Sequence, residues 1–436
     1  MNIYLYSRRA RWCFLILIIS AAAGFSYAAA KVWVAARWNA SADPQKWFAA
    51  AQLEPGNAQY WEQLGRYRQR DLAQRDLSKA AAYLRRATEI GPRSARLWLE
   101  LAALDEERGD FPEAGRAYKI AQSDFPVSPD VAWRYGSFLL RHGDLFAAFT
   151  KLKRALDNDP SLEESALAEC WKAAPDSGLI ADQVLPRKDA YYVRAIHYFL
   201  LQKQTNAALV MWRRRRELNP RAARIDPTDP AIDLVNELIA EGGISEAHKV
   251  WNEAMQRSNG PVEGNDDTSV VFNGGFEHDF LNGGFDWRAL PVGGASYDFD
   301  GSVAHSGRRS LRITFDGTAN INFQHIFQYV PVASHQRYRF LAYLQTEGIS
   351  ASSGIQFDIF DPRDPQELQV MTPVLSGTNP WKPMRIDFES GADTQVLEIL
   401  LRRASGTEFD NHLRGIVWID DVSLVSVTES AVRAAR

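Results

Sequence analysis

A set of residues that recurs every 34 positions restricts the fold of this chain more than any other feature. Residues 98–126 carry small and large apolar residues followed by a proline, and residues 132–160 repeat that order. The first set is Trp98, Leu101, Ala102, Ala114, Tyr118, Ala121 and Pro126, and the second is Ala132, Tyr135, Gly136, Ala148, Leu152, Ala155 and Pro160. A fixed period of this length indicates stacked units of paired helices.

An earlier copy of the pattern, with about three extra residues between its helices, is Trp61, Leu64, Gly65, Ala80, Leu84, Ala87 and Pro92. Small residues let paired helix backbones approach, and large residues fill the groove beside them. Gly109 and Gly143 supply the turn between helices. The pattern resembles the tetratricopeptide (TPR) repeat. We expect five or six such units over residues 44–257, with a concave face that binds protein partners.

An apolar segment precedes this array. Residues 12–30 contain no charged side chain, and this length is close to the ~20 residues that a helix needs to cross a bilayer. Arginines dominate the region before it, which favours a cytoplasmic tail at residues 1–11 and a transmembrane helix or signal anchor at residues 12–36. The rest of the chain would then be exported, to a periplasmic or extracellular location.

A cleaved signal peptide is the alternative for this segment. Ala28, Ala29 and Ala30 are small residues at a plausible cleavage position. Trp33 and Trp38 follow the apolar run, and an uncleaved anchor would use them at the membrane interface. Both alternatives remain open.

The C-terminal third changes from helical to β-type patterning. Residues 258–269 are polar and rich in turn formers, which indicates a linker. Residues 270–428 contain seven short apolar runs separated by turn residues, a pattern typical of an antiparallel sandwich or jelly roll. Residues 429–436 form a tail. The predicted fold class is therefore multidomain: a transmembrane helix, an α-helical solenoid and an antiparallel β-sandwich.

Two stretches delimit the predicted sandwich, and we expect Val271–Trp287 and Ile416–Val427 to be its first and last strands. Three motifs within the domain occur in a fixed order: Asn273-Gly274-Gly275-Phe276-Glu277 followed by Trp287, then His305-Ser306-Gly307, and finally Trp418-Ile419-Asp420-Asp421-Val422-Ser423-Leu424. Together they resemble the carbohydrate-binding modules of the cellulose-binding (CenC-like) type. That resemblance implies a galactose-binding-like jelly roll in which Trp287 and Trp418 are core residues.

The same resemblance implies a metal site. In that family an opening glutamate and a closing aspartate help to hold a structural calcium ion, and Glu277 and Asp421 match those positions, with Asp420 adjacent. Carboxylate oxygens are ligands that Ca²⁺ prefers. The alternative is that these acids cap turns or form surface pairs without a metal.

Strand alternation suggests where a sugar would bind. In residues 338–344, Tyr338, Phe340, Ala342 and Leu344 share one face and would be core, and Ile355, Phe357 and Ile359 would do the same in the next run. The residues between them would then line a sheet face. The candidate glycan-binding residues are Arg339, Tyr343, Gln345, Gln356, Asp358 and Trp381. Trp381 lies in a turn-like segment, where it is either a ligand platform or part of the core rim.

The charge balance argues against nucleic acid as a partner. The whole chain has a formal net charge of −4, and residues 268–427 hold 12 Lys or Arg against 19 Asp or Glu. An acidic domain repels phosphate backbones and strongly anionic polymers.

No motif of a nucleophile elbow, a phosphate-binding glycine loop or a zinc site occurs in the sequence. We therefore expect a non-catalytic, membrane-anchored scaffold of the cell envelope, in which the repeats bind proteins and the sandwich binds a glycan, in polysaccharide assembly or export. One alternative is a purely protein-binding scaffold whose sandwich no longer binds sugar. Another is a glycan-active hydrolase or its accessory subunit.

Overall fold

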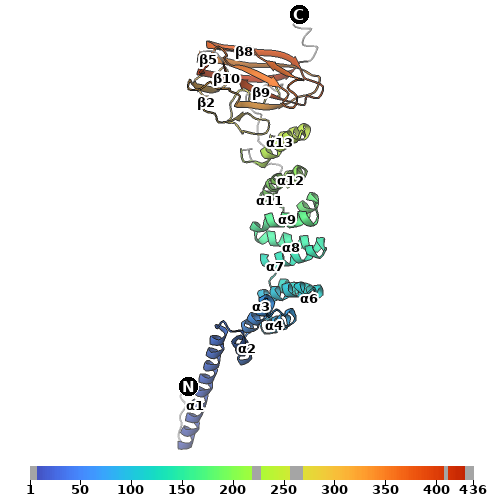
Figure 1. Cartoon of the computed structure of the whole chain (residues 1–436), viewed down its shortest axis with the longest axis vertical. Coiled ribbons are helices and arrows are strands. Elements are labelled where there is room, and N and C mark those ends of the chain that lie inside the picture. The colour runs from blue at the N-terminus through green and yellow to red at the C-terminus, as the bar shows by residue number, and fades with distance from the viewer. Residues whose placement is uncertain (1–6, 219–226, 256–268, 407–410, 428–436) are drawn as a thin grey trace. The chain divides into compact units, whose positions relative to one another are not determined.

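The computed structural model describes residues 7–218, 227–255, 269–406 and 411–427. The chain forms two compact units, Met1–Pro186 and Arg187–Arg436. The first unit is helical, and the second combines helices with a β-sandwich (Figure 1).

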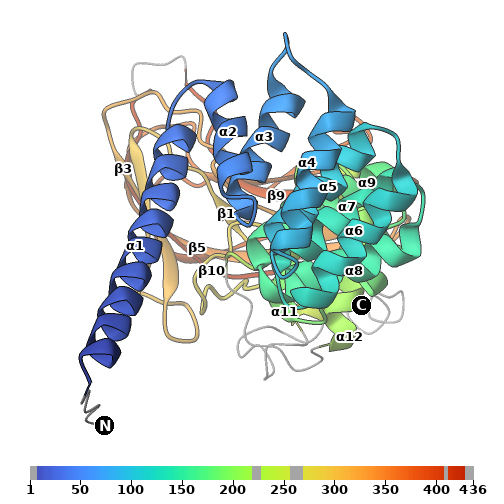
Figure 2. The same ribbon diagram turned by 90° about the horizontal axis from the view of Figure 1, so that it is seen from below.

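The first unit begins with the long helix α1 (Arg8–Asn39), which is a single unbroken helix (Figure 2). It is followed by α2 (Pro44–Leu53), α3 (Ala58–Arg70), α4 (Leu77–Ile90), α5 (Ala95–Glu107), α6 (Phe111–Asp124), α7 (Pro129–Arg141), α8 (Leu145–Asn158), the 3-10 turn η1 (Pro160–Leu162), α9 (Glu163–Ala173) and α10 (Ser177–Gln183).

Helix α1 is long and apolar enough to cross a membrane, and a signal sequence near an N-terminus has the same properties. Most of its apolar side chains are exposed; Trp33, for example, is 66% exposed. Ala35 is the exception, because it is fully buried beside Ala50 and Ala51 of α2. The end of α1 therefore packs as part of the helical array.

The repeat pattern predicted from the sequence is confirmed in α3 to α8. Helices α3 and α4, α5 and α6, and α7 and α8 pack as pairs. At the crossing of α7 and α8, a Cβ added to Gly136 would lie 2.9 Å from Cγ of Leu152, so the small residue is required for the close approach. Gly109 and Gly143 have φ of +78° and +81° in the turns between paired helices, as expected.

The second unit begins with four helices, α11 (Asp189–Leu201), α12 (Thr205–Leu218), α13 (Pro230–Glu241) and α14 (Ile244–Met255). The strands are β1 (Arg288–Ala289), β2 (Ala295–Asp300), β3 (Ser310–Asp316), β4 (Ile326–Pro331), β5 (Arg337–Ile349), β6 (Gln356–Phe360), β7 (Gln369–Met371), β8 (Gly377–Glu389), β9 (Val396–Arg402) and β10 (Arg414–Ser426).

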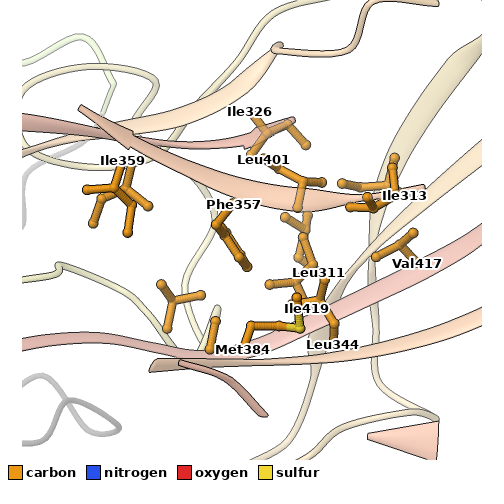
Figure 3. Packing of buried hydrophobic residues seen from close by; sticks show 14 of the residues in the cluster. Leu311, Ile313, Ile326, Leu344, Phe357, Ile359, Met384, Leu401, Val417 and Ile419 are labelled. Atoms are coloured by element: carbon orange, nitrogen blue, oxygen red, sulfur yellow. The ribbon is translucent and has the colours of Figure 1, made fainter. Parts of the chain in front are cut away.

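The strands form two antiparallel five-stranded sheets. Sheet A has the order β2-β3-β10-β5-β8, and sheet B has the order β1-β4-β9-β6-β7. Apolar side chains of both sheets fill the space between them (Figure 3). Phe340 of β5 meets Phe357 of β6 edge to face there, with ring centroids 5.0 Å apart. The predicted sandwich is confirmed, as are the core positions expected in β5 and β6.

One of the two strands expected to delimit the sandwich is wrong. Residues 271–287 form turns instead of the first strand, and the first strand of the described residues is β1. The chain near residue 270 is nevertheless held to β10, because Val270 N donates to Leu424 O and Val422 N donates to Gly274 O. The expected last strand is confirmed, because residues 414–426 form β10, which lies in the middle of sheet A.

The hairpin of α13 and α14 packs against the turns of residues 271–287. Asn236 Oδ1 accepts hydrogen bonds from Gly284 N, at 2.8 Å, and from the Arg288 guanidinium, at 2.7 Å. Trp251 meets Phe272 and Phe285 edge to face. The last helical hairpin therefore forms one body with the sandwich. Of the predicted linker, residues 258–268 lie outside the described residues, as do the predicted tail at 429–436 and residues 1–6 of the N-terminal tail.

Candidate functional site

The side chains predicted to bind glycan do not lie on one face of the sandwich. Arg339, Tyr343 and Gln345 project from the outer face of sheet A, because their neighbours in β5 fill the core. Gln356 and Asp358 project from the outer face of sheet B, to which β6 belongs. The alternation along each strand was predicted correctly, but the two strands contribute to opposite faces.

Asp358 is closed to a ligand. Its side chain is fully buried, and it accepts hydrogen bonds from Arg402 at 2.5 Å and from Gln369 at 3.0 and 3.1 Å. Gln356 beside it donates to the sulfur of Met371 at 3.2 Å. A buried carboxylate needs such hydrogen-bond partners, so Asp358 has a structural role in sheet B. Gln356 is likewise engaged within the sheet.

Three aromatic rings meet on the outer face of sheet A. The imidazole of His305 stacks on Tyr343 with ring centroids 3.7 Å apart and an interplanar angle of 16°. Trp381 meets the same imidazole edge to face at 5.5 Å. Tyr343 and Trp381 are half-buried, and His305 is exposed. We call His305, Tyr343, Trp381 and the adjacent Gln345 the aromatic surface.

Trp381 lies in strand β8 and not in the turn that its sequence neighbours suggested. Pro380 and Pro383 flank it, and a strand accepts them because β8 is the edge of sheet A. Arg339 is bound to the same strand, since its guanidinium donates to both oxygens of Asp387, at 3.0 and 3.1 Å. Because of this ion pair, the Arg339 side chain lies along the edge of sheet A.

Gln345 supplies a polar group beside the rings. It is half-buried, and its amide has no hydrogen-bond partner in the part of the chain that the structure describes. It lies opposite Trp418 of β10. Trp418 is only 6% exposed, but it packs on the outer face of sheet A, because Val417 and Ile419 are the core residues of β10. Both tryptophans are buried as predicted, but only Trp287 lies in the cluster between the two sheets.

Trp418 is fixed by Asp300 of β2, whose Oδ2 accepts from the indole N–H at 3.0 Å. A hydrogen bond from Ser302, followed by the one from Trp418, lowers the pKa of Asp300 to about 2. Asp300 therefore stays ionised and fixes the position of the Trp418 ring beside Gln345.

Two adjacent acids hold His305 in place. Asp420 Oδ2 accepts from the backbone N–H groups of His305, at 2.8 Å, and of Ser306, at 3.1 Å. Asp421 contacts Nδ1 of His305 and accepts from the Ser306 hydroxyl, both at 2.6 Å. Burial raises the pKa of Asp420 to about 6. Asp420 and Asp421 of β10 therefore fix the position of His305 in the aromatic surface.

Glu277 holds the next part of the same loop. Its carboxylate accepts from the backbone N–H groups of Arg308, at 2.6 Å, and of Arg309, at 3.4 Å, and from the Arg308 guanidinium at 3.2 Å. Partial burial acts to raise the pKa of Glu277, but these donors lower it below its usual value.

The surroundings of Glu277 and Asp421 do not match a calcium site. N–H and O–H donors, including a guanidinium, occupy both carboxylates, whereas Ca²⁺ would need free oxygen ligands. Within the described ranges no cluster of three or more His, Cys, Asp or Glu could hold a metal ion. The arrangement favours the alternative in which these acids cap turns and form pairs without a metal.

A second candidate surface lies in the helical array. A cavity of about 490 Å³ is lined by residues of α3, α5 and α7, among them Arg66, Leu99, Glu100 and Arg134. Arg66 of α3 donates to Glu100 of α5, and these residues are 34 positions apart. Equivalent positions of successive repeats thus form a charged groove, which suits a polypeptide partner.

Comparison with known proteins agrees with the helix pairs. The tetratricopeptide repeat model matches residues 69–115 and 104–163. Residues 69–163 therefore hold helix pairs that match the tetratricopeptide repeat. A solved TPR protein, YrrB, described as having an unusual peptide-binding site, is 15% identical and covers 41% of this chain and 94% of its own, with a TM-score of 0.27. No curated protein sequence matches the chain.

Two solved carbohydrate-binding modules also align with the chain. A family 4 module is 16% identical, covers 36% of this chain and 99% of its own, and has a TM-score of 0.27. A family 16 module is 14% identical with the same two coverages and a TM-score of 0.26. Likenesses at these TM-scores carry no argument about function.

Proposed function

We propose that this chain is a non-catalytic, membrane-anchored scaffold of the cell envelope, with a TPR array for protein partners and a sandwich that binds a neutral glycan. The TPR match supports the protein-binding part. The apolar helix α1 supports the anchor, and the arginines before it favour export of the remainder.

The observation that carries the glycan proposal is the aromatic surface. Tyr343, His305 and the half-buried Trp381 bring three aromatic rings together. Gln345 beside them has an amide without a hydrogen-bond partner among the described residues. Small-ligand sites combine such apolar faces with a few placed polar groups. The surface is fixed before binding, because Asp420 and Asp421 already hold the His305 loop, which reduces the entropy lost on binding.

The acidic charge of the sandwich favours a neutral glycan over an anionic one. Asp298, Asp300, Asp420 and Asp421 all lie on or beside the outer face of sheet A. A negatively charged polymer would meet their field at short range. Polysaccharide assembly or export is the setting proposed for this binding.

The test is binding of the full chain, purified in detergent, to a panel of neutral and anionic polysaccharides by affinity gel electrophoresis. We expect retardation by at least one neutral polysaccharide and by no anionic one. Mobility that no neutral polysaccharide changes would contradict the glycan proposal. A polysaccharide that is shortened during the assay would favour the hydrolase alternative.

A protein partner is the second candidate, favoured by the charged groove of α3, α5 and α7. Reversing charge with Arg134→Glu should remove captured partners from a pull-down with the full chain, because Arg134 lines the groove. Asp130, on the same helix, pairs with Arg134 at 2.8 Å, so Asp130→Arg with Arg134→Glu restores the pair but reverses its direction. The double variant has the same net charge as the parent. If it keeps a partner that Arg134→Glu loses, that partner recognises the overall charge and not the arrangement of charges in the groove.

A further inference from the structure

A cavity of about 550 Å³ lies where α1 turns into α2. Its lining includes Trp33, Arg37 and Trp38 of α1, Ser41 of the turn and Lys46 of α2. We call this cavity the juncture notch. It combines two indole rings with two cations next to the end of the apolar segment.

The notch has a fixed shape. Trp47 Nε1 donates to Ser41 O at 2.6 Å, and the Ser41 hydroxyl donates to Trp38 O at 2.7 Å, so the turn is tied to both helices. Ala35 is fully buried against α2 on the same stretch of α1. Arg37 and Lys46 therefore face one space across a turn that cannot swing freely.

Both cations of the notch are available to a ligand. Arg37 and Lys46 are exposed, and neither has a carboxylate within ion-pair distance in the described part of the chain. The nearby Asp43 is engaged, because its Oδ1 accepts from Gln45 N and caps α2. An anion in the notch would meet two cations without displacing a partner.

The notch lies at the depth of lipid headgroups if α1 crosses a bilayer. Arg37 is seven residues beyond Ala30, the end of the uncharged run, which is about 10 Å along a helix. Headgroup regions extend roughly 5–7.5 Å from each side of the hydrocarbon core. The long side chain of Arg37 can reach back into this layer. Trp33 is 66% exposed, and tryptophan is enriched at this level of membranes.

We propose that the juncture notch binds the phosphate-bearing headgroup of an anionic phospholipid, with Arg37 and Lys46 on the phosphate and the tryptophans against the acyl–glycerol region. This inference rests on the proposed membrane anchor. A bound headgroup would fix the angle at which the TPR array leaves the membrane, because α1 and α2 both contribute to the site.

Native mass spectrometry of the full chain in detergent, titrated with phosphatidylglycerol or phosphatidylcholine, tests the proposal. We expect tighter binding of phosphatidylglycerol, and an affinity about 30-fold lower in R37Q/K46Q, since each cation near an anionic headgroup contributes ~1 kcal/mol. The matched control is R8Q/R9Q, which removes the same charge at the other end of α1.

Each result has one meaning. Equal binding of both lipids, or an unchanged preference in R37Q/K46Q, overturns the notch while leaving the anchor intact. A loss of the same size in R8Q/R9Q assigns the preference to net charge and also overturns it. The same spectra report the intact mass, and a chain that begins at Lys31 overturns the anchor and the notch with it, independently of glycan binding.

Discussion

The imidazole of His305 lies flat on the ring of Tyr343, with centroids 3.7 Å apart, although the two residues come from different segments of the sandwich. The contact depends on Asp421, 116 positions after His305, which contacts its Nδ1 at 2.6 Å. The loop that carries His305 and the strands β5 and β10 of sheet A thus form one surface. The predictions below follow from this arrangement and from the packing around it.

Removing the Asp421 carboxylate should loosen the His305 loop. Asp421→Ala leaves the Ser306 hydroxyl and His305 Nδ1 without their partner, and each lost bond to a charged acceptor typically costs ~1.5–3 kcal/mol. We expect a lower melting temperature and weaker glycan binding together. Ser423→Ala in the same strand is the control, and it should change neither. Among the described residues, the Ser423 hydroxyl makes one long hydrogen bond, to Leu341 O at 3.4 Å.

The stability of the sandwich should fall as pH rises from about 4 to 7. Burial raises the pKa of Asp286 to about 7, so the folded state keeps a proton that the unfolded state has released. The proton-linked stability is fully present below the unfolded pKa near 4 and is lost as pH rises through about 7. The loss for Asp286 alone is about 4 kcal/mol.

Asp286→Asn separates this effect from other titrations. In the parent, the backbone N–H groups of Leu281 and Trp287 each donate to one carboxyl oxygen of Asp286. Asparagine replaces one of these oxygens with an NH₂ group, which cannot accept a hydrogen bond, so the variant loses stability at every pH. Its unfolding free energy should nevertheless change less between pH 5 and 8 than that of the parent. The lowered pKa values of His248 and His325 act in the opposite direction and cancel in the comparison. Parallel pH profiles would contradict the assignment.

Calcium removal should leave the melting temperature unchanged, because the donors around Glu277 and Asp421 already satisfy both carboxylates. Differential scanning calorimetry with a chelator and with added Ca²⁺ measures this. A midpoint that rises with Ca²⁺ and falls with the chelator would show that the ion expected from the sequence resemblance binds after all.

The α13–α14 hairpin should stabilise the sandwich. Asn236→Ala removes the acceptor for Gly284 N and the Arg288 guanidinium, both at the packed contact, and we expect a loss of ~2–3 kcal/mol. Asn252→Ala on α14 is the matched control, since Asn252 is exposed and its side chain bonds His248 alone among the described residues. Chemical denaturation of the full chain, followed by tryptophan fluorescence, compares them. Equal stability of the two variants would mean that the hairpin and sandwich unfold separately.

The sequence predicts what depends on local spacing. Gly136 and Leu152 are 16 residues apart, and the spacing of such pairs recurs, so the helix array could be recognised without coordinates. The alternation in β5 also follows from local order, because Phe340 and Ala342 must share a face.

The pairing of strands is not local, and it decides the candidate site. Tyr343 and Gln356 lie on consecutive strands, yet β5 joins sheet A and β6 joins sheet B, so the residues face opposite ways. The sequence does not predict His305 as a site residue. Its contacts with Asp420 and Asp421, more than 100 positions away, hold it on Tyr343. Nothing in the spacing of these residues reveals that contact.

The most direct test of the account is glycan affinity measured by titration calorimetry on the full chain and on Trp381→Ala, using the neutral polysaccharide that retards the parent most. We predict at least a 30-fold loss of affinity, since removal of an aromatic anchor typically costs ~2 kcal/mol or more. Tyr297→Ala, an exposed aromatic of β2 away from the aromatic surface, should bind as the parent does. Unchanged affinity in Trp381→Ala, or an equal loss in Tyr297→Ala, would contradict the account.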